Sequence, residues 1–227
     1  MALLEVNDLE RTFGGIVALD GVTFDVASGE TNVIIGPNGA GKTTLFNCIT
    51  GYHIPDHGTV RFQGTDITST PDYKTARTGI RRTFQEVDVF DELTVAENIS
   101  LGAFESSPRE MMELLDLLDI HDKEGSELTL FERKRVSLAL ASEGELLLLD
   151  EVFSGLNPTE KPAMVGYLDA LAERKTLMLI EHDIETAFDL ADTVTILAQG
   201  QVMKRGTPEE MLDDETVRED FLGEMAI

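Results

Sequence analysis

The chain is poor in basic residues. Eighteen lysines and arginines stand against 43 aspartates and glutamates, which gives a formal net charge of −25, and the acidic residues are spread along the whole sequence. Because no basic face is evident, we expect no nucleic-acid partner. A surface of this kind can simply keep a protein soluble. A sharper hypothesis is adaptation to high salt, since about molar salt shortens the range of charge repulsion to roughly 3 Å.

Cysteine and long apolar runs are also scarce. The single cysteine, Cys48, excludes an internal disulfide and is typical of a reducing compartment. It falls on the apolar face of a predicted helix, so we expect it to be buried in packing. No run approaches the roughly 18 apolar residues that a membrane span needs. Residues 1–5 lack the basic start of a signal peptide. The length of 227 residues suffices for one large domain with a small inserted subdomain.

The most informative feature present is a glycine-rich stretch between an apolar run and a helix-like segment. This strand–loop–helix order is the context of a P-loop. Glycines let the backbone amides wrap an anion, and the following helix points its positive end at the same place. Lys42 is expected to reach the β- and γ-phosphates, and Thr43 to give its hydroxyl to Mg²⁺. The predicted triphosphate-binding residues are Gly36, Pro37, Asn38, Gly39, Ala40, Gly41, Lys42, Thr43 and Thr44.

The other segments alternate as in an α/β protein. Hydrophobic periodicity distinguishes strands, with period two or short apolar runs, from helices with period 3.6. The expected strands are 3–7, 17–26 (after a turn at 11–15), 31–35, 59–63, 146–149, 176–180, 193–198 and 201–204. The expected helices are 42–50, 71–79, 110–120, 131–141, 159–173, 184–190 and a tail at 208–222.

A helical block at about 95–143 lies between two halves of the α/β pattern, so it is interpreted as an insertion. The predicted fold class is α/β. We expect a P-loop NTPase (RecA-like) core made of residues 1–94 and 144–227, with an N-terminal antiparallel β subdomain. The inserted α-helical subdomain would occupy about 95–143, and residues 1–227 would form one domain.

An acidic pair ends the apolar run 146–149. At the end of a buried strand, Asp150 can hold Mg²⁺ in its second shell. Glu151 beside it is the natural candidate for the general base that polarises an attacking water. A strand that ends in Asp-Glu can also carry plain solvated carboxylates. Its place about a hundred residues after a P-loop favours the functional interpretation.

The order of these motifs resembles the ATP-binding-cassette (ABC) ATPases, and the resemblance covers nearly the whole chain. The motifs are the P-loop, Gln85, the stretch 128–136, Asp150-Glu151, the stretch 155–158 and His182. Several stretches look like the ATPase subunits of branched-chain amino-acid importers: Arg11–Gly15, Arg82–Gln85, Gly155–Pro158, Ile180–Asp183 and Phe221–Glu224.

The resemblance implies roles for single residues. Phe13 would stack on adenine, although an ordinary hydrophobic strand residue is the alternative. Gln85 would touch Mg²⁺ or the attacking water and report the γ-phosphate to the helical insertion; by itself it could be a polar loop residue. His182 would contact the γ-phosphate and orient the water. A lone histidine is usually structural, but the carboxyl end of a strand in an α/β sheet is where ligands bind.

The signature segment departs from the family pattern. Leu-Ser-Gly-Gly-Gln is expected there, and the chain has Leu-Thr-Leu-Phe-Glu over 128–132. In the family this loop caps the γ-phosphate of the opposite subunit, so Thr129 would bind ATP in trans. Phe131 replaces a glycine that permits close approach, and Glu132 brings a negative charge that only Arg133 or Arg135 could offset. Thr129 and Glu132 also match a capping box. We favour a working variant that grips ATP less tightly than a standard signature.

The expected function is an ATP-hydrolysing subunit of an ABC importer, with branched-chain amino acids as cargo by resemblance only. The resemblance implies a head-to-tail homodimer, or a heterodimer with another ABC ATPase, that binds two ATP with Mg²⁺ at the cytoplasmic face of the cell membrane. Its partners would be integral membrane permease subunits and, indirectly, an extracytoplasmic binding protein. The predicted catalytic residues are Glu151, His182, Gln85 and Lys42, and the predicted metal-site residues are Thr43, Gln85 and Asp150.

Three alternatives stay open. A non-transport ABC ATPase of translation or repair usually has two cassettes or a long coiled-coil insertion, and this chain has neither. A cassette with one degenerate hydrolysis half-site would follow from the altered signature. A GTPase is disfavoured, because no Asn-Lys-x-Asp motif is present and Phe13 suits adenine.

Overall fold

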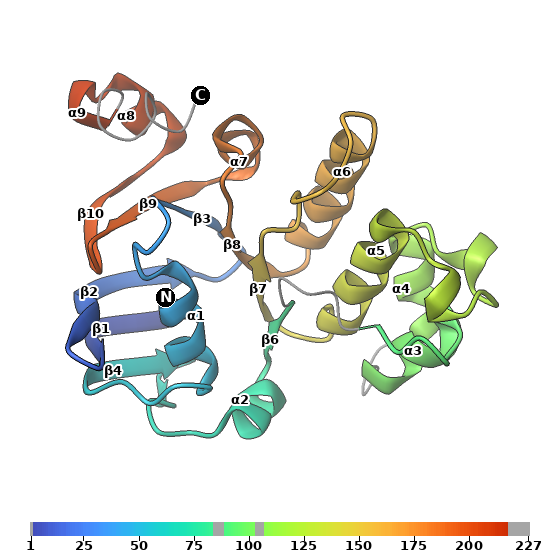
Figure 1. The fold of residues 1–227 in the computed structure, drawn as a ribbon, viewed down its shortest axis with the longest axis horizontal. Helices are drawn as coiled ribbons and strands as arrows, with labels where there is room; N and C mark the ends of the chain where they lie inside the picture. The colour runs from blue at the N-terminus through green and yellow to red at the C-terminus, as the bar shows by residue number, and fades with distance from the viewer. Residues whose placement is uncertain (1, 84–88, 103–106, 218–227) are drawn as a thin grey trace.

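The computed structural model of the chain describes residues 2–83, 89–102 and 107–217. Its centre is a six-stranded sheet of order β10-β9-β3-β8-β7-β6 (Figure 1). β10 pairs antiparallel to β9, and the other pairs are parallel, so their carboxyl ends share one edge. The strands are β3 (Thr31–Ile35), β6 (Ile80–Arg82), β7 (Leu146–Asp150), β8 (Thr176–Ile180), β9 (Thr193–Ala198) and β10 (Gln201–Gly206).

The strands at the middle of this sheet are buried along their whole length. β3, β7 and β8 are buried at every residue, which explains why β7 has four consecutive leucines instead of an alternating pattern. The predicted α/β fold class with a parallel sheet is confirmed.

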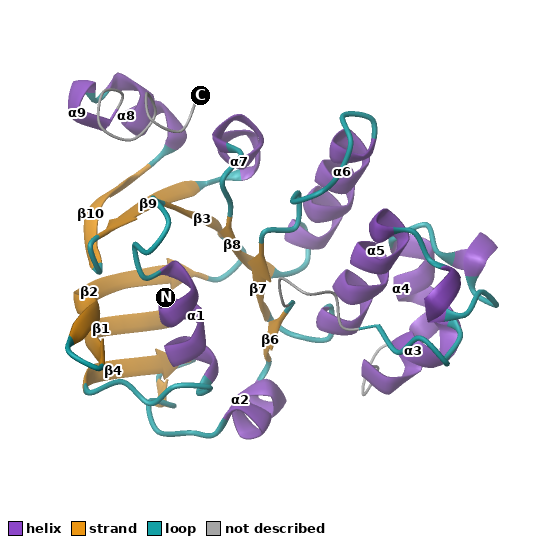
Figure 2. Ribbon diagram, in the orientation of Figure 1, coloured by secondary structure: helices purple, strands orange, loops and turns teal. Residues whose placement is uncertain are grey.

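A second, antiparallel sheet of order β2-β1-β4-β5 lies beside α1 (Figure 2). It contains β1 (Ala2–Phe13), β2 (Ile16–Ala27), β4 (His57–Phe62) and β5 (Thr65–Asp66). The turn predicted over 11–15 is present but shorter, because pairing continues up to Phe13 opposite Ile16. Gly14 and Gly15 have positive φ angles of 52° and 88°, so two residues are enough to close the hairpin.

The helices lie on both sides of the central sheet, and α3, α4 and α5 gather beyond its β6–β7 end (Figure 1). Two clusters of buried side chains hold these layers: one joins α3–α6 to the sheet, and the other joins α1 to the antiparallel strands. The helices are α1 (Lys42–Thr50), α2 (Asp72–Thr78), α3 (Val95–Gly102), α4 (Pro108–Leu114), α5 (Leu130–Ala141), α6 (Glu160–Ala172), α7 (Ile184–Leu190), α8 (Pro208–Asp213) and α9 (Glu215–Val217).

Two predicted helices are shorter than their hydrophobic periodicity indicated. The helix predicted over 110–120 ends at Leu114, because Asp116 has a φ of 54° and the guanidinium of Arg135 donates to its carbonyl at 2.8 Å. The tail predicted over 208–222 is interrupted at Asp214, whose carboxylate accepts a hydrogen bond from the Val217 amide at 3.0 Å. Residues beyond 217 lie outside the described part.

Cys48 is buried on α1 as predicted, and burial raises the pKa of its thiol to about 11. The thiol is therefore held in its unreactive protonated form. Among the helices of the described ranges, none has both the length and the apolarity that crossing a membrane requires.

Candidate nucleotide-binding and hydrolysis site

The glycine-rich loop connects the carboxyl end of β3 to the start of α1. The Leu45 amide donates to the Gly41 carbonyl at 2.8 Å, so the amides of residues 42–44 precede the first hydrogen bond inside the helix. Gly36 and Gly41 are packed against other backbone: an added Cβ would lie 2.0 Å from the Leu197 oxygen and 2.3 Å from the Ala18 oxygen. The loop can adopt this shape only with glycine at those positions, and its amides suit an anion.

Lys42 lies within this loop. Its side chain is only 6% exposed, and Nζ donates to the carbonyl oxygens of Gly36 at 2.5 Å and Pro37 at 3.1 Å. Burial lowers the pKa of Lys42, and the carboxylates of Glu151 and Asp150 oppose that effect. The cation of the P-loop and the two acidic residues after β7 therefore share one electrostatic environment.

The three strand ends that carry the predicted groups are neighbours. β8 lies between β3 and β7, so the loop after β3, the pair after β7 and the residues after β8 meet at one edge of the sheet. The Glu151 amide donates to the Ile180 carbonyl at 2.9 Å, and His182 Nε2 lies 3.1 Å from Glu151 Oε1. A base and a group that can orient it are thus in contact.

Asp150 is buried in an ion pair that the sequence did not reveal. Arg82, the last residue of β6, donates to Asp150 Oδ2 at 2.8 Å and to Asn47 Oδ1 at 2.5 Å. The guanidinium also lies 5.5 Å above the Phe46 ring. Arg82 therefore connects the helix after the P-loop to Asp150, the last residue of β7.

The oxygen donors at this edge fit Mg²⁺. The hydroxyl of Thr43 at the start of α1 and the carboxylate of Asp150 at the end of β7 are hard ligands. Mg²⁺ in phosphate sites typically uses one or two protein oxygens together with phosphates and waters. No cluster of three or more His, Cys, Asp or Glu that could hold a metal by itself occurs in the described ranges. The donor set thus fits a metal that binds together with a nucleotide.

Phe13 lies at the tip of the β1–β2 hairpin and is 38% exposed. The guanidinium of Arg11 lies 4.7 Å from its ring centroid, and the His53 ring meets it edge-on at 5.2 Å. Arg11 is itself held by Asp56 at 2.7 Å. These contacts orient the Phe13 ring and leave it accessible enough to meet a base.

The signature segment begins α5 with the predicted capping box. Thr129 accepts a hydrogen bond from the Glu132 amide at 3.2 Å, and the Glu132 carboxylate accepts one from the Thr129 amide at 2.8 Å. The cation that offsets Glu132 is Lys123, at 2.8 Å, so the expectation of Arg133 or Arg135 was wrong. Those two arginines bind Asp91 and the carbonyls of residues 115 and 116.

Phe131 is turned toward the protein interior. Its ring packs 6.4 Å from the Tyr167 ring of α6, and the Arg135 guanidinium lies 4.9 Å from the Phe131 centroid. The Phe131 ring, at the position where the family pattern has glycine, therefore packs against α6. Leu130 is the exposed apolar residue of this segment.

Gln85, predicted to act at the metal or the water, lies outside the described residues. The strand that leads to it ends at Arg82, and Thr83 Oγ1 accepts a hydrogen bond from the Asp150 amide at 3.3 Å. Its role stays a prediction.

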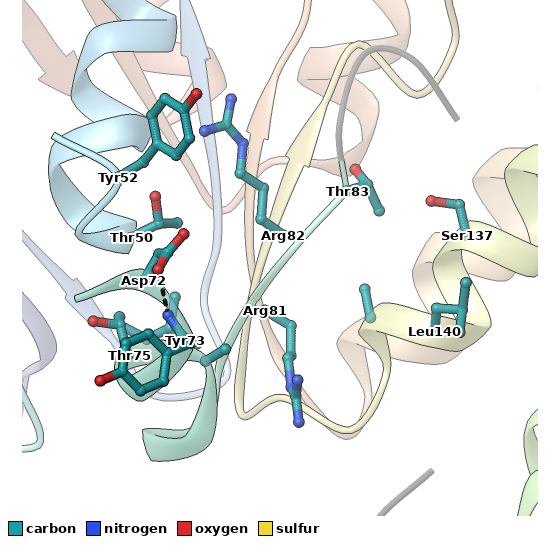
Figure 3. A pocket seen from close by; sticks show the side chains of 13 residues that line it. Thr50, Tyr52, Asp72, Tyr73, Thr75, Arg81, Arg82, Thr83, Ser137 and Leu140 are labelled. Carbon is teal, nitrogen blue, oxygen red and sulfur yellow. Dashed lines mark hydrogen bonds between the residues drawn. The ribbon is translucent and has the colours of Figure 1, made fainter. Parts of the chain in front are cut away.

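A groove of about 320 Å³ opens beside that strand (Figure 3). Ser137 and Leu140 of α5 face Thr50 and Tyr52 across it. Arg81, Arg82 and Thr83 lie between these two walls. The groove therefore separates the α1–α2 side of the core from the helical block, and it adjoins the residues before position 84.

Sequence reasoning missed three charged residues around the site whose side chains are buried: Arg82, Lys134 and Glu181. Arg82 and Lys134 belonged to short basic clusters, and Glu181 stands directly before the predicted His182. For Arg82 and Glu181 the available signal was a charged residue at or directly after the end of a strand, since buried charges need a partner. That signal could not identify the partner. Lys134 lies within α5 and had no such signal.

A glycine-rich loop before a helix, an acidic pair at the end of a buried strand and a histidine in contact with the second acid define a P-loop NTPase site. Residues 19–154 match the ABC transporter family, and the chain belongs to that family. It is 34% identical to the high-affinity branched-chain amino acid transport ATP-binding protein BraF of Pseudomonas aeruginosa, with 98% of each chain covered. It is equally similar to LivG of Escherichia coli, at 34% identity over 98% of each chain.

Solved structures agree with this assignment. A nucleotide-free ATP-binding cassette from an ABC transporter superposes with a TM-score of 0.86 at 27% identity, covering 100% of this chain and 99% of that one. The ADP conformation of an ATP-binding cassette superposes with a TM-score of 0.87 at 29% identity, covering 98% and 99%. The resemblance inferred from the motifs is confirmed, and the chain is an ABC ATPase.

Proposed function

We propose that this chain is the ATP-hydrolysing subunit of an importer for branched-chain amino acids. The relatives with matching length are described as branched-chain amino acid transport ATP-binding proteins. The chain would act as one domain over residues 1–227, with the helical subdomain at about 95–143. It would work at the cytoplasmic face of the membrane as a head-to-tail dimer.

The observation that carries the hydrolytic part is the contact between His182 and Glu151 at the edge where the P-loop lies. Residues 36–44 would hold the phosphates, Lys42 would neutralise their charge, and Phe13 would stack on adenine. Glu151 would take the proton of the attacking water while His182 and Gln85 orient it. Mg²⁺, held through Thr43, Asp150 and Gln85, would supply further charge neutralisation.

Thr129 of one subunit would cap the γ-phosphate bound by the other. The capping box supports this, because it uses the Thr129 oxygen as an acceptor and leaves the hydroxyl proton available for donation. The arrangement favours a working variant signature over a degenerate half-site.

The groove beside β6 is the proposed contact for a permease subunit. An occupant there would touch Arg82 and Thr83, which bind Asp150 through its side chain and its amide. Exposed Tyr52 and Tyr73 at the groove provide an amphipathic rim of the kind found at protein interfaces. β6 would thus connect the surface that contacts the membrane partner to the sheet edge that carries Asp150 and Glu151.

The test combines turnover and partner capture. Glu151→Gln should lower kcat for ATP about 10²–10⁴-fold while ATP still binds. The wild-type chain, produced with its natural partners, should co-purify with two multi-span proteins. Turnover by Glu151→Gln close to wild type would refute the base assignment. Co-purification with ribosomes or repair complexes instead would favour the non-transport alternative.

A further inference from the structure

The backbone of Glu151 has an unusual conformation. Its φ angle is +51°, in the left-handed region that non-glycine residues avoid because Cβ crowds the backbone there. Such a conformation persists only when its surroundings hold it. The Glu151 carbonyl accepts a hydrogen bond from the Ser154 amide at 3.2 Å and a second one from Lys134 Nζ at 3.0 Å.

Lys134 reaches this carbonyl from a different part of the fold. It lies on α5, five positions after Thr129, and its side chain is 8% exposed. Burial lowers the pKa of Lys134, and the carboxylates of Glu181 and then Glu151 oppose that effect. The buried lysine therefore lies between the helix that carries the signature segment and the turn that carries the candidate base.

Glu181 holds the same turn from the opposite side. It is 2% exposed at the end of β8, and its Oε1 accepts a hydrogen bond from the Phe153 amide at 3.3 Å. The turn of residues 151–154 is thus held at a carbonyl by α5 and at an amide by the segment after β8. No side-chain atom of Lys134 or Glu181 needs to reach the nucleotide for this to work.

We propose that Lys134 is a positioning residue for ATP hydrolysis: through the Glu151 carbonyl, it fixes the turn that aims the general base. The inference rests on the proposed role of Glu151. It also connects two functions of one subunit. The same helix presents Thr129 to the partner's ATP and holds the base for its own ATP, so a displacement of α5 is transmitted to the base in its own chain.

The first experiment compares Lys134→Met with Lys134→Arg and the wild type. Methionine keeps most of the apolar stem and removes the donor, so kcat should fall about 10²-fold, the size expected when a reacting group is displaced by about 1 Å. The dissociation constant for a fluorescent ATP analogue should change less than about twofold, since Lys134 donates its hydrogen bond to the Glu151 carbonyl and not to the P-loop. Lys134→Arg keeps a donor and should recover part of the turnover.

Lys204→Met is the matched control. Lys204 is a lysine of β10 that pairs with the carboxylate of Asp214, away from the sheet edge that carries Glu151 and His182. Its removal should leave kcat unchanged. Turnover by Lys134→Met equal to that of Lys204→Met would overturn the proposal.

Lys134→Met also leaves the Glu181 carboxylate buried without its neighbouring cation, which could destabilise the fold. The double variant Lys134→Met/Glu181→Gln carries neither charge and is measured beside it. If the lysine acts as a donor to the turn, the double variant folds and still shows the low kcat. Recovery of wild-type turnover in the double variant would show that only the buried charge mattered, and would refute the positioning role. Loss of activity in Glu151→Gln, measured in parallel, tests the base assignment separately.

Discussion

Nε2 of His182 lies 3.1 Å from Oε1 of Glu151, and the two residues follow adjacent parallel strands. A hydrogen bond of this length can orient the carboxylate toward a water. The contact joins a residue after β8 to one after β7, 31 positions earlier, next to the loop after β3.

His182→Ala should therefore lower kcat by about 10²-fold and leave ATP affinity within a few-fold of wild type. The physical reason is the loss of orientation for Glu151 and the water. Steady-state turnover measures kcat, and equilibrium nucleotide binding measures the ATP affinity. His121→Ala removes an exposed histidine on the helical block and should leave both kcat and ATP affinity unchanged. An ATP affinity that falls in step with kcat would contradict an orienting role.

Phe131→Gly tests the altered signature. The substitution removes the ring that packs on Tyr167, so stability should fall by about 2 kcal/mol. If the glycine permits closer approach to the facing ATP, ATP-dependent dimerisation should become tighter despite that loss. Tyr167→Leu breaks the same ring contact without changing the loop, and it should lose stability only. Unchanged dimerisation and turnover in Phe131→Gly would contradict the hypothesis of a weaker grip.

The ion pair between Arg82 and Asp150 should be important for folding. Both side chains are buried, so Arg82→Met would leave a carboxylate without its cation and cost about 3–5 kcal/mol of unfolding free energy. Arg174→Met removes the arginine of an exposed pair with Glu110 and should cost less than about 1 kcal/mol. Urea titrations of both variants give the comparison. Similar small losses would show that Asp150 gains little from Arg82.

Glu181 predicts a specific dependence of stability on pH. Burial raises its pKa to about 7 from an unfolded value of 4.5, while the amides of Phe153 and Val152 and the charge of Lys134 oppose the rise. Because the folded pKa is the higher one, the folded state favours the protonated acid. The associated stabilisation is complete below about pH 4.5 and is lost as pH rises through about 7.

The side chain introduced by Glu181→Gln carries no charge at any pH, so this variant should lack the pH-dependent stabilisation. Relative to the variant, the wild type should lose up to about 3 kcal/mol of unfolding free energy between pH 5 and pH 8.5, since one pKa unit corresponds to about 1.4 kcal/mol. Urea unfolding at both pH values measures the difference. Parallel pH dependences for the two proteins would refute the raised pKa.

The net charge of −25 leads to a prediction about salt. If the surface is adapted to high salt, raising KCl from about 0.05 M to about 2 M should screen repulsion and add about 2 kcal/mol, or about 4–8 °C in Tm for a chain of this length. Sucrose at equal osmolality controls for general exclusion of solute. Full stability and activity in dilute buffer would end the hypothesis.

The sequence alone predicted the parts of this protein whose signals are local. A P-loop needs glycine, lysine and threonine at set places between a strand and a helix, so residues 36–44 could be identified from their order. The apolar run 146–149 likewise indicated a buried parallel strand, because a run this short that ends in an acidic pair suits a strand better than a helix or a membrane segment. The two residues of the Thr129–Glu132 capping box are only three positions apart, so it was predicted for the same reason.

Only the tertiary structure decided which charges meet. Arg82 reaches the Asp150 carboxylate across 68 positions, and Lys123, not the neighbouring arginines, pairs with Glu132. Lys134 reaches the backbone carbonyl of Glu151 across 17 positions. Burial makes these partners necessary, yet their identity depends on strand order and on how α5 packs against the sheet. The sequence therefore determined that this protein binds a triphosphate, and the fold determined that Arg82 holds the Asp150 carboxylate and that Lys134 holds the Glu151 carbonyl.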